Sequence, residues 1–132
     1  MKFVVTQLLL YRKGQNNMRL FVDDERQAPK GWHRARTVTE AIRILATMSV
    51  EEVSLDYDMS CFSMAGGCTH TSEETFMAVV YYLRIMENRP RIKIHTGNIR
   101  AGYQMANLLS IPYTGLPYDE RDYDEEDDNA RT

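Results

Sequence analysis

The sequence is poor in cysteine, with two among 132 residues, and two are too few for a disulfide-stabilised scaffold. It also lacks a long apolar run, because no uninterrupted apolar stretch approaches the roughly 18 residues that span a bilayer. The apolar start of the chain is interrupted by Thr6 and Gln7 and lacks the small-residue cleavage site of a secretion signal. We therefore expect a protein of the reducing cytoplasm that makes no membrane contact.

Hydrophobic residues make up 43% of the chain and charged residues 27%, and these values argue against a disordered protein. The charge is unevenly distributed. Residues 119–132 hold eight acidic and two basic side chains, a net charge of −6, whereas residues 1–118 have a net charge of +3. A basic body suits a polyanionic ligand such as a nucleotide or RNA, although a solvated surface with an acidic tail explains the charge alone.

The length is that of one domain, and composition divides the chain into three parts. Residues 1–17 end in the turn-rich run KGQNN, so we predict an N-terminal extension or an extra edge strand there. The domain itself is expected over residues 18–118. Residues 119–132 are expected to form a disordered, acidic tail.

Short apolar runs alternate with helix-typical segments. We predict strands over residues 19–22, 32–36, 53–58 and 91–95. Helices are expected from the N-cap Thr37 to about Ser49, from a capping box at residues 71–74 to the residue before Pro90, and from Ile99 to about Leu109. This alternation predicts an α/β fold with a mostly parallel sheet and helices on both faces. Pro112 and Pro117 leave any last strand short and at an edge.

Ionisable residues stand at the ends of three predicted strands, namely Asp23 and Asp24, Asp56 and Asp58, and His95. Parallel strands would bring them to one edge of the sheet, where ligands of such folds bind. Because gathered carboxylates repel one another, a hard divalent cation would stabilise them. We predict Asp23, Asp24 and Asp56 as ligands of Mg²⁺ or Mn²⁺. Asp58 is a weaker candidate, which a regular strand would point to the same side as Asp56, and turn or cap roles are the alternative for all four.

Other polar residues near the same edge suit a phosphate. His95 is a candidate for acid–base chemistry or a phosphate contact. Substrate-binding candidates are Arg26, Trp32, Thr96, Asn98 and Arg100. The alternatives are a structural histidine, a simple helix cap at Asn98 and a core tryptophan. The group Cys61, Cys68 and His70 lacks close cysteine spacing and a fourth ligand, so we do not predict a zinc site there.

Three separated runs, LFVDDERQAPKGW, VSLDYDMS and IHTGNIRAGYQM, resemble the cyclic-phosphate-processing receiver-like domain family over about residues 18–109. The resemblance implies a flavodoxin-like fold with strand order 2-1-3-4-5, a metal-supported acidic site and a role with nucleotide cyclic phosphates. Under it, the acidic pair Asp23 and Asp24 and the pair Asp56 and Asp58 match the two acidic motifs. The last motif is matched by His95, Asn98, Gly102 and Met105.

The sequence departs from related patterns in two places. Thr96 and Gly97 stand where the family often has a Ser-Ala pair. No lysine follows Lys93, whereas receivers of response regulators carry a lysine after their fifth strand that helps hold the phosphoryl group. Its absence argues against a phosphoaspartate switch.

We therefore expect a metal-dependent phosphoesterase that hydrolyses a nucleotide cyclic phosphate, with His95, Asp56 and Asp58 as catalytic residues. The substrate is a cyclic nucleotide or oligonucleotide messenger, as in viral counter-defence, or an RNA 2′,3′-cyclic phosphate end. One alternative is a non-catalytic protein that sequesters a cyclic nucleotide, and another is a degenerate receiver. The oligomeric state stays open, with a homodimer among the options.

Overall fold

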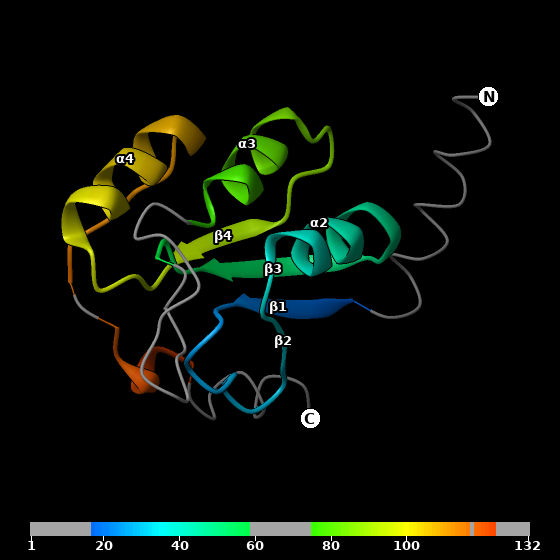
Figure 1. Ribbon diagram of the computed structural model, residues 1–132, viewed down its shortest axis with the longest axis horizontal. Helices are drawn as coiled ribbons and strands as arrows, with labels where there is room; N and C mark the ends of the chain where they lie inside the picture. The colour runs from blue at the N-terminus through cyan, green and yellow to red at the C-terminus, as the bar shows by residue number, and fades with distance from the viewer. Residues whose placement is uncertain (1–16, 59–74, 117, 124–132) are drawn as a thin grey trace, which may run out of the picture.

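The computed structural model describes residues 17–58, 75–116 and 118–123. One parallel sheet has the order β2-β1-β3-β4 and consists of β1 (Met18–Val22), β2 (Trp32–Ala35), β3 (Val50–Leu55) and β4 (Arg91–Ile94). The helices are α2 (Val38–Thr47), α3 (Met77–Ile85) and α4 (Ile99–Leu109), and a 3₁₀ turn, η1 (Glu120–Tyr123), follows (Figure 1). The α/β fold with a parallel sheet is confirmed.

The strand order matches the first four strands of the predicted order 2-1-3-4-5. No fifth strand follows α4 in the described residues, and β4 is an edge of the sheet there. Two local features explain the difference. Pro112 has no N–H to donate to a neighbouring strand, and Gly115 adopts φ +75°, which is incompatible with an extended strand.

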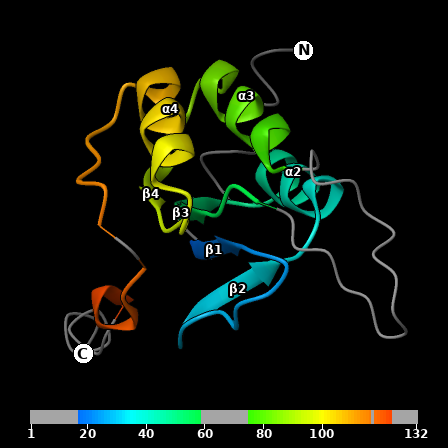
Figure 2. The same ribbon diagram turned by 60° about the vertical axis from the view of Figure 1, so that its left-hand side comes forward.

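All three helices pack on one face of the sheet (Figure 2). The strands contribute Leu20, Val22, Val53 and Leu55 to this core, all fully buried. They alternate with residues that face the other side, as the two-residue period of a strand requires. The helices contribute the other large core residues, among them Ile44, Leu45, Val79, Val80, Leu83, Met105 and Leu109.

The opposite face carries a smaller aromatic core of Phe21, Trp32 and Tyr123, with Tyr118 packed against it. The expectation of helices on both faces therefore holds for one face only within the described residues. Residues 23–31 connect β1 to β2 and include Pro29 and Gly31, which has φ +85°, so this link is too short and too interrupted for a helix. Tyr123, which we placed in the acidic tail, is 7% exposed, so packing continues to that residue.

Helix starts follow the expected capping chemistry in two cases. The hydroxyl of Thr37 accepts a hydrogen bond from the N–H of Glu40 at 3.1 Å, and Asn98 Oδ1 accepts one from the N–H of Ala101 at 3.1 Å. The capping box at residues 71–74, the N-terminal segment 1–16 and the Cys61, Cys68 and His70 group lie outside the described residues. No helix in the described ranges is long and apolar enough to cross a membrane.

The cap of α2 gives a test of the local fold. Thr37→Ala removes the side-chain acceptor, so we expect the free energy of unfolding to fall by about 1 kcal/mol in urea denaturation. Thr39→Ala is the matched control, since Thr39 is exposed within the first turn, and it should change stability by less than about 0.5 kcal/mol. Equal effects of the two substitutions would contradict the assigned cap.

Candidate functional site

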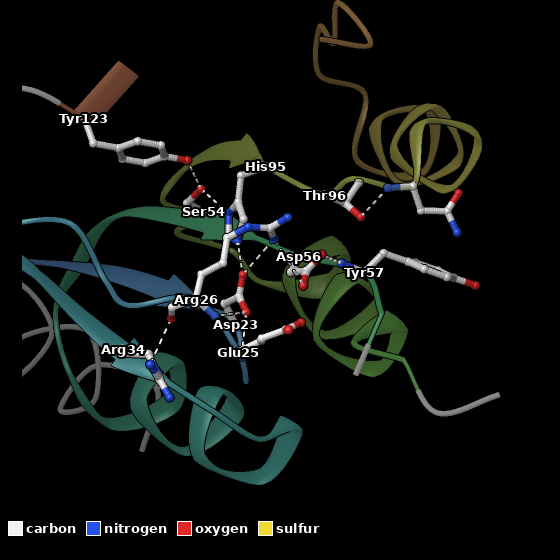
Figure 3. Close-up of polar contacts among 11 residues, drawn as sticks. Asp23, Glu25, Arg26, Arg34, Ser54, Asp56, Tyr57, His95, Thr96 and Tyr123 are labelled. Carbon is white, nitrogen blue, oxygen red and sulfur yellow. Dashed lines mark hydrogen bonds and ion pairs between the residues drawn. The ribbon is translucent and has the colours of Figure 1, made fainter. Parts of the chain in front are cut away.

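Three ionisable side chains meet just beyond the carboxyl ends of neighbouring strands (Figure 3). Asp23 follows β1, Asp56 follows β3 and His95 follows β4. One ligand atom of each lies within 4.8 Å of the other two. Their residues are 0%, 5% and 2% exposed, in that order. We call these three residues the acid–histidine cluster.

Asp23 is held by donors on both of its carboxylate oxygens. Oδ1 accepts from the N–H groups of Glu25 at 2.8 Å and Arg26 at 2.9 Å, because the chain turns back over the side chain directly after β1. Oδ2 accepts from Arg26 Nη1 at 3.1 Å and lies 2.9 Å from His95 Nε2. Burial by itself would raise the pKa of Asp23, but these hydrogen bonds outweigh it and lower the pKa to about 2.

Asp56 has a weaker set of partners. Its Oδ1 accepts from the N–H of Tyr57 at 2.7 Å, and a hydrogen bond with the Thr96 side chain adds to this. Burial and the negative charge of Asp23 raise the pKa of Asp56 to about 6, and the hydrogen bonds and Arg26 offset this only in part. Two carboxyl groups in one site thus have pKa values that lie far apart, which is typical of functional sites.

Arg26 supplies the positive charge beside the two carboxylates. Its Nη1 lies 3.1 Å from Asp23 Oδ2 and 3.6 Å from Asp56 Oδ2. The guanidinium carbon is 5.0 Å from the centroid of the Tyr118 ring, a cation–π contact. The Arg26 side chain is 35% exposed, far more than the acid–histidine cluster, so an anion arriving from solvent meets this guanidinium first.

His95 is fixed by contacts on its face and on both ring nitrogens. Its ring stacks on Phe21 with centroids 4.1 Å apart and an interplanar angle of 6°. Nδ1 lies 2.7 Å from the hydroxyl of Ser54, which also hydrogen-bonds to the hydroxyl of Tyr123. Burial lowers the pKa of His95, against the opposing effect of Asp23, so the imidazole is neutral near pH 7.

A neutral imidazole gives this chain of hydrogen bonds a consistent direction. Nε2–H of His95 donates to Asp23, Nδ1 accepts the O–H of Ser54, and Tyr123 donates to Ser54. Because the Ser54 hydroxyl can donate or accept a hydrogen bond, the ring can also carry its proton on Nδ1. In that tautomer the lone pair of Nε2 can bind a metal ion. His95 thus positions Asp23 in the first arrangement and offers a ligand atom in the second.

The donor set suits a divalent cation. Two carboxylates and one imidazole nitrogen lie close enough to share an ion, and the raised pKa of Asp56 records a repulsion that a cation would relieve. Oxygen ligands suit Mg²⁺ and Mn²⁺, whereas a nitrogen ligand favours the transition metal. If all three side chains bind, the set fits Mn²⁺ better than Mg²⁺.

Some of the predicted site residues lie apart from this cluster. Asp24 is 6% exposed but does not share the ligand group of its neighbour Asp23. Consecutive residues point to different sides of the chain. Asp58 is exposed and its backbone bridges to Thr75. We expected it on the side of Asp56, but β3 already ends at Leu55.

The predicted substrate-binding residues divide into two groups. Arg26 contacts the carboxylates, and Thr96 is fully buried next to Asp56. Asn98 and Arg100 are exposed at the start of α4, where Asn98 acts as a cap. Trp32 is 8% exposed and packs edge-on against Phe21 and Tyr123, so it is a core residue with no face for a base.

Sequence analysis did not predict three residues of this site, Ser54, Tyr118 and Tyr123. The alternation of β3 places Ser54 on the same side as Asp56, a signal that was available. Tyr118 and Tyr123 return to the site from the far end of the chain, and nothing local in the sequence signals this contact. Their rings lie 5.7 Å apart beside His95 and Phe21.

The fold and the site agree with a comparison against protein families. A family model described as the cyclic-phosphate processing receiver domain matches residues 18–110. The chain belongs to this family. The matched range includes every residue of the acid–histidine cluster and Arg26, but it ends before Tyr118 and Tyr123. A search of curated proteins and a search of solved structures found no match.

The opposite pKa shifts predict opposite effects on stability in metal-free buffer. The folded state binds the proton of Asp56 more tightly than the unfolded state does, so stability falls as pH rises from about 4 to 6. Asp56→Asn removes this cost and should increase the free energy of unfolding at pH 8 by about 1 to 3 kcal/mol. The increase should vanish near pH 4, where Asp56 is protonated in the wild type.

Asp23→Asn should decrease the free energy of unfolding at pH 8, the opposite of the effect of Asp56→Asn. The lowered pKa of Asp23 contributes stability above pH 4 that is lost as pH falls toward 2, so this variant should be destabilised at pH 8. Asp58→Asn is the control, because Asp58 is exposed, and it should be nearly neutral. Chemical denaturation at pH 4 and pH 8 measures all three, and a destabilised Asp56→Asn variant at pH 8 would refute the assigned repulsion.

Proposed function

We propose that this receiver-like domain is a metal-dependent phosphoesterase that hydrolyses a nucleotide cyclic phosphate. The proposal is carried by the buried acid–histidine cluster beside a half-exposed arginine. The family links the domain to cyclic phosphates, and the chemistry of the cluster suits hydrolysis. A cyclic nucleotide messenger and an RNA 2′,3′-cyclic phosphate end both carry the required group.

Each polar group has a role in the proposed reaction. Asp23 and Asp56 would hold the cation, with His95 Nε2 as a third ligand in the tautomer that carries its proton on Nδ1. When bound, Mg²⁺ or Mn²⁺ would polarise a phosphoryl oxygen and acidify water. The guanidinium of Arg26 turns from the carboxylates to the phosphate, which it can bind through two N–H groups. Hydrolysis forms one bond from water oxygen to phosphorus, breaks one bond from phosphorus to a ribose oxygen, and transfers a proton to that oxygen.

Asp56 is suited to bind the cation. Its pKa of about 6 without a metal reflects burial and repulsion from Asp23, and a bound ion would relieve this repulsion and lower the pKa. His95 is 2% exposed, and its two ring nitrogens contact Ser54 and Asp23. We therefore assign it to holding Asp23 in one tautomer and to metal ligation in the other. Asp58, which we expected to be catalytic, is separated from the cluster.

Turnover with defined substrates tests the proposal. Purified protein with Mn²⁺ or Mg²⁺ should hydrolyse a cyclic mononucleotide, a cyclic dinucleotide or an RNA oligonucleotide with a 2′,3′-cyclic phosphate end. Asp56→Asn should lower kcat by about 100-fold or more, because it removes a proposed ligand of the metal. Glu87→Gln, an exposed acid after α3, should retain full activity. Failure to hydrolyse any of these, with the metal demonstrably bound, would refute catalysis.

One observation favours a second function. Arg26 contacts both carboxylates, an arrangement that also suits a site that binds and sequesters a cyclic nucleotide without cleaving it. In that case the Asp56→Asn variant should still bind the nucleotide in equilibrium dialysis, and the wild-type protein should release it unchanged.

Arg26 also gives a test of metal binding itself. Since its guanidinium and a cation compete for the same carboxylates, Arg26→Met should tighten Mn²⁺ binding by about 10-fold or more, the equivalent of 1.4 kcal/mol. The same substitution should reduce turnover, because the phosphate loses its partner. Calorimetric titration with Mn²⁺ measures the affinity, and unchanged or weaker binding would show that the ion does not occupy this site.

A further inference from the structure

A cleft of about 450 Å³ opens along the outer edge of β4. It lies between this strand and residues 112–116 and 118–123, where a fifth strand would stand in the order 2-1-3-4-5. Within the described residues no strand pairs with that edge. The volume suits one small ligand, since sites for such molecules usually measure about 300 to 1,000 Å³.

The cleft shares a wall with the acid–histidine cluster. His95 and Tyr118 both line it, and their rings lie 5.4 Å apart. Tyr118 also contacts the guanidinium of Arg26. A ligand whose phosphate reaches Arg26 would therefore have the rest of its body beside Tyr118, at the mouth of this cleft.

The walls combine flat rings with a row of backbone groups. Tyr113 and Tyr118 line the cleft and are partly exposed, and aromatic rings of this kind stack on nucleobases. The N–H of His95 bonds to the carbonyl of Leu55 in β3, so the backbone groups of Ile94, the residue before it, point away from β3. Ile94 lines the cleft, so its N–H and carbonyl face a bound molecule as one donor and one acceptor.

The cleft is lined by both acidic and basic side chains. Asp119 and Asp122 line it together with Lys93. The Asp119 carboxylate is paired with Arg121 at 2.7 Å, and Lys93 Nζ donates to the backbone carbonyl of Asp122 at 3.3 Å. Asp122 therefore offers a carboxylate that can accept hydrogen bonds from an amino group, while Arg26 behind Tyr118 attracts the phosphate of the same ligand.

We propose that this cleft is the nucleobase subsite of the protein and that it prefers bases with an exocyclic amino group, such as adenine. The inference rests on the proposed function, because it assumes that the phosphate lies beside Arg26. A nucleobase provides the flat ring, the edge of alternating donors and acceptors and the amino group that these walls match. Because no fifth strand stands beside β4 in the described residues, there is room for the part of the substrate that does not react.

Binding of three probes that lack a cyclic phosphate tests the subsite in the full-length protein. Calorimetry with adenosine monophosphate, inosine monophosphate and ribose 5-phosphate should show that the adenine nucleotide binds at least about 10-fold more tightly than the baseless sugar phosphate. Leu116→Trp fills the cleft from an exposed position and should reduce this ratio to about 1, with ribose 5-phosphate binding unchanged. Ile85→Trp, at another exposed position, is the matched control and should preserve the ratio.

A second variant, Asp122→Asn, tests the subsite independently in case Leu116→Trp does not fold. Asp122→Asn is isosteric and should lower the affinity for adenosine monophosphate by about 3- to 10-fold, with little effect on inosine monophosphate. Equal binding of all three probes, binding of none, or a ratio that survives Leu116→Trp would overturn the subsite. If cyclic phosphates are hydrolysed while the probes bind equally, the proposed function stands and the subsite fails. Preference for adenine without hydrolysis supports the subsite and contradicts catalysis.

Discussion

The main constraint on this site is the repulsion between two carboxylates that neighbouring parallel strands bring to the same edge of the sheet. Asp23 and Asp56 follow β1 and β3, which are neighbours in the sheet, so neither side chain can avoid the other without leaving the fold. Hydrogen bonds stabilise the charge on Asp23, whereas the pKa of Asp56 rises to about 6. The protein thus keeps one carboxylate firmly ionised and its neighbour near its titration point, at a cost in stability.

The rest of the site responds to this constraint. Arg26 follows Asp23 by three residues and reaches both carboxylates. His95 supports Asp23 from the end of β4, on the other side of β3, through a chain of hydrogen bonds that ends at Tyr123. The C-terminal segment therefore does two things at once, since its tyrosines cover the second face of the sheet and also fix the imidazole. A segment outside the range of the family match has become part of the site.

The sequence predicted the sheet and much of the site for a clear reason. The apolar runs around Leu20 and Val53 and the caps at Thr37 and Asn98 are local signals, and parallel strands convert their order into one functional edge. The sequence could not separate Asp23 from Asp24, or Asp56 from Asp58, because side-chain direction depends on where each strand ends. The position of Tyr123 depends on packing between distant segments, and no local pattern records that. The unpaired edge of β4 in the described residues, by contrast, has local signals in Pro112 and Gly115.

The most direct test of the central claim is carboxyl ¹³C NMR of the aspartate side chains, titrated with and without Mg²⁺. The account predicts one metal-free carboxyl, Asp56, with a pKa near 6 and a second, Asp23, near 2, and a marked downward shift for Asp56 when Mg²⁺ is added. If Asp23 and Asp56 both titrate near the ordinary value of 3.8 and neither responds to the metal, the two carboxylates do not form one coupled site.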